Sequence, residues 1–410
     1  MTSEPRQAFV WVWLPGAADP VVAGRLDRTG EIVTFTYGQS DLAREEKIAL
    51  YEPELPLRRG EISPLVGDVA GCIADAAPDA WGRRVILNRR AGRDAVDTTE
   101  ENLLTYLLES GSDRIGALDF QRSASEYVAR STADATLTEL AESAERLEQG
   151  IPLSPELDQA LLHGSSIGGA RPKALLSDGA RRLIAKFSST TDTYPIVKGE
   201  LVAMELARRA GLNVATVALT HALGKDVLLI DRFDRPAAGG RRAMVSALSI
   251  LELDEIGARY ASYAELARIV RARFTDPLPT LRELFSRITL NILTGNNDDH
   301  ARNHAAFWDG TALTLTPAYD ICPQPRAGGE IAQIMAIGED GYRMSQLAGC
   351  VARASTYLLS ETDAREIIDH QIDVIETDWA DVCDQATLTE IDRARFWQRQ
   401  FLNPYATEGY

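Results

Sequence analysis

The densest group of polar side chains in this 410-residue sequence is the stretch GNNDDHARN, from Gly295 to Asn303. Asp298 is followed five residues later by the amide of Asn303, and a second acid, Asp320, arrives after a short apolar segment. In phosphoryl transfer, one carboxylate orients the attacking hydroxyl, while an amide oxygen and another carboxylate hold Mg²⁺ against the phosphates. Each of these residues alone is more often a helix cap or a turn former. The three at this spacing favour a phosphoryl-transfer site.

Three features upstream of this stretch are candidates for binding phosphate or for forming an ion pair. The stretch SSIGGARPKA, from Ser165 to Ala174, is rich in small residues, so its backbone N–H groups can approach a phosphate closely. Lys186 lies among apolar residues in LIAKF, where a lysine is costly to bury unless it is paired. An edge-strand lysine whose ammonium reaches water is the alternative. Glu200 opens the next predicted helix, as an ion-pair partner for Lys186 or simply as a favourable first-turn acid.

The elements before these residues follow from the apolar pattern. Aromatic and β-branched runs beginning at Phe9 and Glu31 predict strands. Residues 67–90 predict a helical passage, and the spacing of leucine and alanine predicts a helix over 137–150. Two prolines within residues 151–157 predict a linker or a seam between subdomains.

The elements that must deliver the polar residues come after this seam. KALL and RRLIAKF flank a turn at Ser177–Gly179 and predict a hairpin, and strands are expected over 214–220 and 226–233. A helix over 201–211 and a longer helix over 281–295 each end at a glycine. A second hairpin, turning at Asp309-Gly310, carries the chain from the polar cluster to Asp320. The last third is helical and includes an acidic helix over 361–384, so the order of elements predicts an α+β fold.

Composition narrows the class of protein. The formal net charge of −17 argues against sequence-blind binding of nucleic acid, whose phosphates require a positive surface. The four cysteines are widely spaced and contain no CxxC pair, so neither a disulfide framework nor a zinc knuckle is expected. The sequence contains no run of 18 apolar residues, so no membrane-spanning helix is expected. The first residues do not resemble a secretory signal. We therefore expect a cytoplasmic protein.

In chain order the sequence has a small-residue loop, a strand lysine, a helix glutamate, an Asp-x4-Asn loop and an aspartate that follows a hairpin. This is the order of the functional residues in a protein kinase. The usual kinase motifs GxGxxG, HRD and DFG are missing. With SSIGGARPK, LIAKF, LLIDRFDR, GNNDDHARN and LTPAYD in this order, the sequence resembles the HipA-like serine/threonine kinase toxins of bacterial toxin–antitoxin systems. APDAWGRR, from Ala77, and DRIGALDF, from Asp113, resemble the N-terminal region of that family, so the resemblance spans nearly the whole chain.

The resemblance implies a two-lobed, protein-kinase-like α+β fold with a β-rich N-terminal extension and a helical C-terminal lobe, divided as 1–150, 151–235 and 236–410. It implies ATP and Mg²⁺ as cofactors, with Asp298 as the catalytic acid, Asn303 and Asp320 as Mg²⁺ ligands, and Lys186, paired with Glu200, on the phosphates. It also implies a DNA-binding antitoxin as partner, growth arrest as the outcome, and an aminoacyl-tRNA synthetase, especially the glutamyl enzyme, or another translation factor as substrate.

Other nucleotide contacts are implied only by position. The phosphate loop corresponds to Ser166, Ile167, Gly168, Gly169, Ala170 and Lys173, with Ser166 at the family's autophosphorylation position. The hinge whose backbone binds adenine corresponds to Asp231, Arg232 and Phe233, with Asp234 near the ribose. His300 lines the nucleotide pocket, and Arg302 stands where a lysine is common. Pro172 removes one N–H that could have held phosphate.

Three alternatives stay open. Asp299, adjacent to Asp298, is a second candidate for the catalytic acid, although the spacing to Asn303 favours Asp298. A metal-dependent hydrolase would use Asp298, Asp299, His300 and His304, but His304 opens a predicted strand, where residues four apart lie about 13 Å from each other. A kinase-like binding module, acting as a co-repressor with a DNA-binding antitoxin, is compatible with the same residues and can coexist with catalysis.

Overall fold

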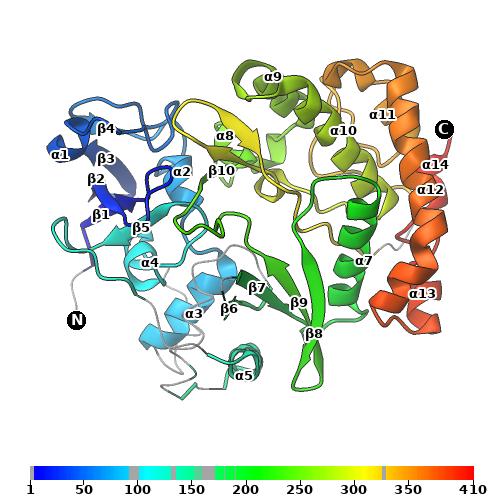
Figure 1. Cartoon of the computed structure of the whole chain (residues 1–410), viewed down its shortest axis with the longest axis horizontal. Helices are drawn as coiled ribbons and strands as arrows, with labels where there is room; N and C mark the ends of the chain where they lie inside the picture. The colour runs from blue at the N-terminus through cyan, green and yellow to red at the C-terminus, as the bar shows by residue number, and fades with distance from the viewer. Residues whose placement is uncertain are drawn as a thin grey trace. The chain divides into compact units, whose positions relative to one another are not determined.

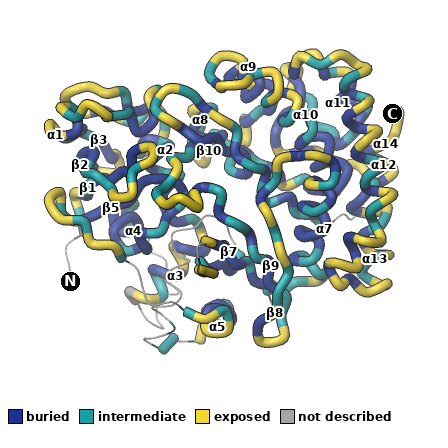
Figure 2. Tube along the Cα trace, in the orientation of Figure 1, coloured by how far each residue is buried: buried dark blue, intermediate teal, exposed yellow. Residues whose placement is uncertain are grey.

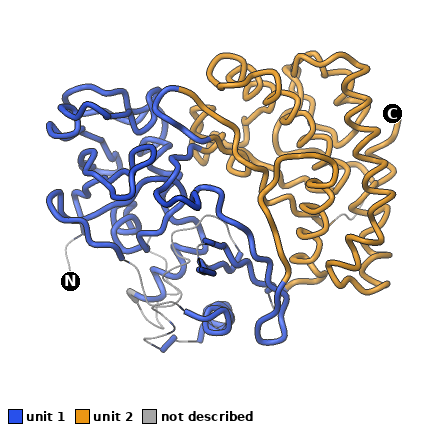
Figure 3. Tube along the Cα trace, in the orientation of Figure 1, with its two compact units in different colours: residues 1–191, 220–245, 307–311 blue, residues 192–219, 246–306, 312–410 orange. Residues whose placement is uncertain are grey.

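The computed structural model describes residues 4–91, 101–130, 135–151, 153–154, 157, 171–179, 181–189, 191–325 and 329–410. The chain forms two compact units (Figure 3). Unit 1 contains residues 1–191, 220–245 and 307–311, and unit 2 contains residues 192–219, 246–306 and 312–410. Because each unit is assembled from separate chain segments, the division into three consecutive domains stays a prediction.

Unit 1 begins with a five-stranded antiparallel sheet of order β4-β3-β2-β1-β5. Its strands are β1 (Gln7–Val12), β2 (Val21–Thr29), β3 (Ile32–Tyr37), β4 (Glu61–Ile62) and β5 (Leu118–Gln121). The strands predicted from Phe9 and Glu31 are confirmed as β1 and β3. The sequence did not indicate β2, because charged residues interrupt its apolar pattern. Gly24 is required in β2, since a Cβ there would lie 2.6 Å from the Phe35 ring.

The helices of unit 1 are α1 (Gln39–Leu42), α2 (Gly71–Ala74), α3 (Ala80–Ala91), α4 (Leu103–Glu109) and α5 (Leu137–Glu148). The helical passage predicted over 67–90 is divided into α2 and α3 around Pro78, which a helix interior does not tolerate. The helix predicted over 137–150 is confirmed as α5. Thr136 and Glu139 form a capping box at its start, and Leu140, Ala144 and Leu147 are buried as the spacing requires.

A second antiparallel sheet has the order β6-β7-β9-β8, with β6 (Lys173–Asp178), β7 (Arg181–Phe187), β8 (Val217–Ala222) and β9 (Lys225–Asp231). The hairpin predicted around Gly179 is confirmed as β6 and β7. Buried side chains of this sheet pack with α3 and α5 in one apolar core, which includes Trp81, Leu140, Ala185, Phe187 and Val227. Figure 2 colours the buried and exposed stretches along the chain. This core covers one face of the sheet and fixes the strand that carries Lys186.

Unit 2 is mainly helical (Figure 1). Its helices are α7 (Ile196–Arg209), α8 (Ala247–Ile250), α9 (Tyr263–Arg273), α10 (Pro277–Leu293), α11 (Leu347–Val351), α12 (Glu361–Gln385), α13 (Glu390–Phe396) and α14 (Pro404–Thr407), with short 3-10 turns η2 (Gly257–Tyr260), η3 (Ala301–Asn303) and η4 (Ala354–Tyr357). The helices predicted over 201–211, 281–295 and 361–384 are confirmed as α7, α10 and α12. Helix α12 packs against both α7 and α10.

A third sheet of order β10-β11-β12 consists of β10 (Ala243–Ser246), β11 (Ala305–Trp308) and β12 (Leu313–Leu315). Strands β11 and β12 are the hairpin predicted at Asp309-Gly310. Gly310 has a φ of +101°, which a side chain would strain, and the Asp309 side chain accepts a hydrogen bond from the Thr311 amide. Within the described part of the chain, no helix is both long enough and apolar enough to cross a membrane.

Candidate active site

The end of α10 sets the position of the predicted catalytic loop. Gly295 adopts a φ of +70°, and a Cβ at this position would lie only 2.7 Å from the Gln400 carbonyl oxygen. The Leu402 amide donates a hydrogen bond to the Leu293 carbonyl, and the Gln324 amide donates to the Gly295 carbonyl at 3.0 Å. The loop therefore leaves a helix end that two distant segments of unit 2 hold in place.

The adjacent acids Asp298 and Asp299 have opposite environments. Asp298 is exposed, whereas Asp299 is buried. The Asp299 carboxylate accepts hydrogen bonds from Asn291 Nδ2 at 2.7 Å and from the Tyr263 hydroxyl, and lies 2.8 Å from His304 Nε2. Burial would raise the pKa of Asp299, but His304 and Tyr263 outweigh it and hold the pKa below its usual value. Asp299 is thus engaged inside the unit, and Asp298 is the acid that a substrate can reach.

The electrostatics of Asp298 suit a proton acceptor. Partial loss of hydration raises the pKa of Asp298, His300 opposes this, and the negative charges of Asp320 and Asp299 add to the rise. The Asp320 carboxylate is therefore close enough to Asp298 for its charge to raise the pKa of Asp298. Asn303 is buried on η3 and donates a hydrogen bond from Nδ2 to the Asp298 backbone carbonyl at 3.4 Å.

The loop that carries Asp320 is fastened to the same structure. Asp320 has a φ of +60°, an uncommon backbone state for a residue other than glycine. Its carbonyl accepts a hydrogen bond from Asn296 Nδ2 at 3.4 Å, and the same amide donates to Asn291 Oδ1 at 3.0 Å. The Tyr319 hydroxyl donates to the Arg302 carbonyl at 2.7 Å. Two buried asparagines therefore connect the loop of Asp298 with the loop of Asp320.

In unit 1, two lysines share one face of a sheet. Lys173 on β6 and Lys186 on β7 are directly opposite each other in the antiparallel register. Strand β7 lies between β6 and β9, so the edge-strand alternative for Lys186 is wrong. The indole N–H of Trp81 donates to the Lys173 carbonyl at 3.1 Å and fixes the start of β6. Two cations on one face of a sheet are suited to a phosphate chain.

The predicted hinge begins at Asp231, the last residue of β9. Asp231 pairs with Arg181 at 2.7 Å, and the Arg232 amide donates to the Arg182 carbonyl at 2.9 Å, so that amide is already used. The Phe233 ring packs edge-to-face on Phe307, with centroids 5.9 Å apart. Asp234 is buried, and both of its oxygens accept hydrogen bonds from protein donors. The predicted ribose contact of Asp234 is therefore without structural support.

The remaining predicted residues have varied positions. Ser166, Ile167, Gly168, Gly169 and Ala170 lie outside the described residues. His300 is half-buried, and Arg302 forms an ion pair with Glu255. Glu200 is buried on α7, in unit 2, whereas Lys186 belongs to unit 1, so their ion pair stays a prediction.

The hydrolase alternative has no support in the structure. His304 Nε2 is engaged with Asp299 rather than directed to a metal shared with His300. Among the residues that the structure describes, no group of three or more His, Cys, Asp and Glu side chains could hold a metal ion. An oxygen-ligated Mg²⁺ site that includes the Asn303 amide has a different set of donors from such a group.

Sequence reasoning missed the buried residues that support the two acidic loops. Asn291, Asn296 and Tyr263 were not singled out, although each bonds either Asp299 or the Asp320 loop. A polar residue inside the apolar stripe of α10 was the available signal for Asn291. Tyr263 gave no signal, because its contact with Asp299 spans 36 residues of sequence.

Known proteins show the same organisation. Residues 12–121 match the family model of the HipA N-terminal domain, and residues 165–379 match that of the HipA-like C-terminal domain. The serine/threonine-protein kinase toxin HipA of Shewanella oneidensis is 24% identical over 184 residues, which cover 38% of this chain and 42% of that protein. The putative kinase Y4mE of Sinorhizobium fredii is 27% identical over 323 residues, covering 72% and 73% of the two chains. The match thus spans less than half of the toxin's length and about three quarters of the putative kinase.

The fold itself is matched by a solved structure. A chain in the complex of the Shewanella oneidensis toxin–antitoxin system HipA, HipB and its operator DNA has a TM-score of 0.71 at 19% identity, covering 97% of this chain and 95% of that chain. The predicted α+β, HipA-type fold is confirmed by this match. Since the C-terminal family model alone covers more than half of the sequence, this chain belongs to the HipA-like family.

Proposed function

We propose that this chain is an ATP- and Mg²⁺-dependent serine/threonine protein kinase that serves as the toxin of a bacterial toxin–antitoxin pair. The observation that carries the proposal is the exposed Asp298, next to the internally bonded Asp299, on a loop tied through Asn291 and Asn296 to the loop of Asp320. The names of the two relatives described above, a kinase toxin and a putative kinase, support this reaction class.

Asp298 is the base of the proposed reaction. It accepts a hydrogen bond from the substrate hydroxyl and takes its proton as the hydroxyl oxygen bonds to the γ-phosphorus. The bond between the γ-phosphorus and the bridging oxygen breaks, and ADP leaves with that electron pair. The raised pKa of Asp298 makes this carboxylate a better proton acceptor than an ordinary aspartate.

Asp320 and Asn303 would hold the Mg²⁺ ion. Carboxylate and amide oxygens are the hard donors that this cation prefers. The charge of Asp320 raises the pKa of Asp298, which indicates a negative potential at this site that a bound cation would reduce. When bound, the ion neutralises charge on the phosphates. Lys173 and Lys186 would contact the phosphates of the same nucleotide, and Ser166 is the proposed autophosphorylation position.

The partner and the substrate are further parts of the proposal. The similar HipA structure contains HipB and operator DNA, which supports a DNA-binding antitoxin as the partner of this chain. The net charge of −17 favours DNA contact through such a partner, and a co-repressor role can accompany catalysis. The proposed substrate is an aminoacyl-tRNA synthetase or another translation factor, whose phosphorylation would arrest growth.

The test uses purified full-length chain with Mg²⁺ and labelled ATP, offered its antitoxin and a cell lysate. Asp298→Asn should lower phosphate transfer by about 10²–10⁴-fold without loss of folding, because it removes the base. Glu376→Gln, which changes an exposed acid on α12, is the matched control and should keep the wild-type rate. Failure of the wild type to label itself or any protein, or full activity of Asp298→Asn, would overturn the proposal. Phosphopeptide mapping of cells that express wild type or Asp298→Asn then identifies the substrate.

A further inference from the structure

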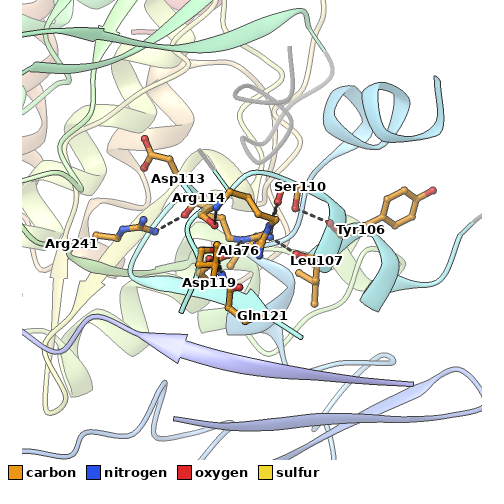
Figure 4. Close-up of polar contacts among 12 residues, drawn as sticks. Ala76, Tyr106, Leu107, Ser110, Asp113, Arg114, Asp119, Gln121 and Arg241 are labelled. Carbon is orange, nitrogen blue, oxygen red and sulfur yellow. Dashed lines mark hydrogen bonds and ion pairs between the residues drawn. The ribbon is translucent and has the colours of Figure 1, made fainter. Parts of the chain in front are cut away.

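The motif DRIGALDF, from Asp113 to Phe120, has no role in the proposed chemistry. Its first residues, Asp113–Gly116, form a loop between α4 and β5 in unit 1. Figure 4 shows that Arg114 points into this region, with its guanidinium surrounded by acceptors.

Arg114 holds the loop rigidly to unit 1. Its fully buried guanidinium pairs with Asp119 at 2.9 Å and donates hydrogen bonds to the carbonyls of Ala76, at 3.1 Å, and of Leu107 (Figure 4). Asp119 also pairs with Arg130 at 2.7 Å. The loop is therefore anchored to the turn after α2, to α4 and to β5 by groups whose hydrogen bonds are satisfied.

From this anchored loop, side-chain and backbone atoms reach the segment just after β9. Asp113 Oδ1 pairs with Arg232 at 3.0 Å and with Arg235 at 2.7 Å. Arg232 also donates to the Arg114 carbonyl at 2.6 Å, and the Gly116 amide donates to Asp234 Oδ2 at 2.8 Å. Asp234 in turn pairs with Arg232 at 2.8 Å and Arg235 at 2.9 Å.

The members of this network leave little freedom for rearrangement. The side chains of Arg232 and Asp234 are 0% and 3% exposed. Gly116 has a φ of +77°, which a side chain would strain, and a Cβ there would lie tightly, 3.3 Å from the Met244 amide nitrogen. Buried ion pairs add little net stability, since desolvation opposes their attraction, but separating one partner from the other is costly. The same arrangement therefore constrains the backbone from Arg232 to Arg235.

We propose that the Asp113–Gly116 loop positions the segment 231–235 for contact with the adenine ring of the nucleotide. The N-terminal region would thereby determine the affinity for the nucleotide. This inference rests on the proposed function together with the predicted hinge, in which backbone groups of Asp231–Phe233 other than the Arg232 amide, which bonds the Arg182 carbonyl, bind adenine. Asp113 is then a positioning residue: it touches no substrate and acts through Arg232 and Arg235.

The experiment measures ATP affinity and turnover in the full chain. Asp113→Asn keeps the shape of the side chain and removes its charge, and Arg235→Lys keeps the charge and removes the fork that contacts Asp113 and the Gly116 carbonyl. Each variant should raise the KM for ATP and the Kd for ADP about tenfold while kcat stays within about twofold. Glu109→Gln, which removes a surface ion pair with Arg122 nearby, should change neither constant.

The outcomes separate this inference from the function on which it rests. If the wild type transfers no phosphate and binds no ADP, the proposed function fails. If the wild type is active and both variants bind ADP as it does, the positioning role is wrong, even where kcat or Tm falls. Should Asp113→Asn not fold, as judged by circular dichroism, Arg235→Lys decides the matter alone.

Discussion

Two neighbouring carboxylates show how much the environment of a residue determines. Asp298 is exposed with a raised pKa, and Asp299 is buried with a lowered pKa, although the two are adjacent in sequence. The difference comes from three donors, the side chains of Asn291, Tyr263 and His304, that face Asp299 only. One acid is thus available for proton transfer because the other supports the loop.

Asp299→Ala should lower the free energy of unfolding by about 3 kcal/mol, because it leaves several buried donors without an acceptor. Asp298→Ala, the matched control one residue earlier, should not lower it. Urea unfolding of both variants measures the difference. Equal losses of stability in the two variants would contradict the distinct environments.

Asp298→Asn should raise the free energy of unfolding at pH 7.5 in the absence of Mg²⁺ and nucleotide. A carboxyl whose pKa is raised by folding stabilises the protein in its protonated form, and this contribution is lost as the pH rises through the folded pKa. Asparagine resembles the protonated acid and avoids the loss. The gain should shrink as the pH is lowered towards 4, and a variant less stable than the wild type at pH 7.5 would be the opposite result.

At the scale of elements, the catalytic loop depends on how α10 ends. Gly295 combines a positive φ with close contact to the backbone of Gln400, whereas Gly211, at the end of α7, has a φ of +84° and open space around it. The two glycines therefore separate the cost of backbone conformation from the cost of a steric clash.

Gly211→Ala should cost about 1–2 kcal/mol of stability, the price of a left-handed residue with a side chain. Gly295→Ala should cost more and should also slow phosphate transfer, because a Cβ would displace the Gln400 backbone and shift the loop of Asp298. Urea unfolding and initial rates measure both effects. Similar losses of stability with unchanged rates would show that the contact at Gly295 does not set the loop.

Elements with strong periodicity were predictable from the sequence, and long-range partners were not. The amphipathic stripes of α5, α7 and α10 and the turns at Gly179 and Gly310 are local signals, and the structure confirms them. The order of strands around Lys186 is a tertiary property, so its place in the middle of a sheet could not be inferred. The partners of Asp299 lie up to 36 residues away, and no local pattern links them.

At the scale of the whole molecule, four carboxylates of this acidic chain are surrounded by cations and hydrogen-bond donors. Asp113, Asp119, Asp234 and Asp299 are each held by basic or hydroxyl groups that outweigh the effect of burial, so the pKa of each is lowered. Asp41 behaves in the opposite way, since burial raises its pKa to about 6. The stability of the molecule should therefore depend on pH in two separate ranges.

Below pH 5 the free energy of unfolding of the wild type should fall steeply. Groups with a lowered folded pKa contribute stability that is present above their unfolded pKa of about 4 and is lost as the pH falls. Asp41, whose folded pKa of about 6 lies above its unfolded value, adds stability as the pH falls from about 6 to about 4, so it offsets part of the loss near pH 5 and adds nothing further below about pH 4. Urea unfolding at pH 5, 4 and 3 tests this, with Asp113→Asn as a variant whose slope should be shallower. Stability that is constant or increases over this range would contradict it.

The hydrogen bond from Leu402 to Leu293 and the contact of Gln400 with Gly295 also determine when, during synthesis of the chain, the loop of Asp298 gains its support. A ribosome synthesises the loop of Asp298 about a hundred residues before it synthesises the segment that supports the start of that loop. A nascent chain whose synthesis has not yet reached Phe401 contains every proposed catalytic side chain but lacks this support. The start of the Asp298 loop therefore gains its full support only after the segment from Gln400 to Leu402 has been synthesised.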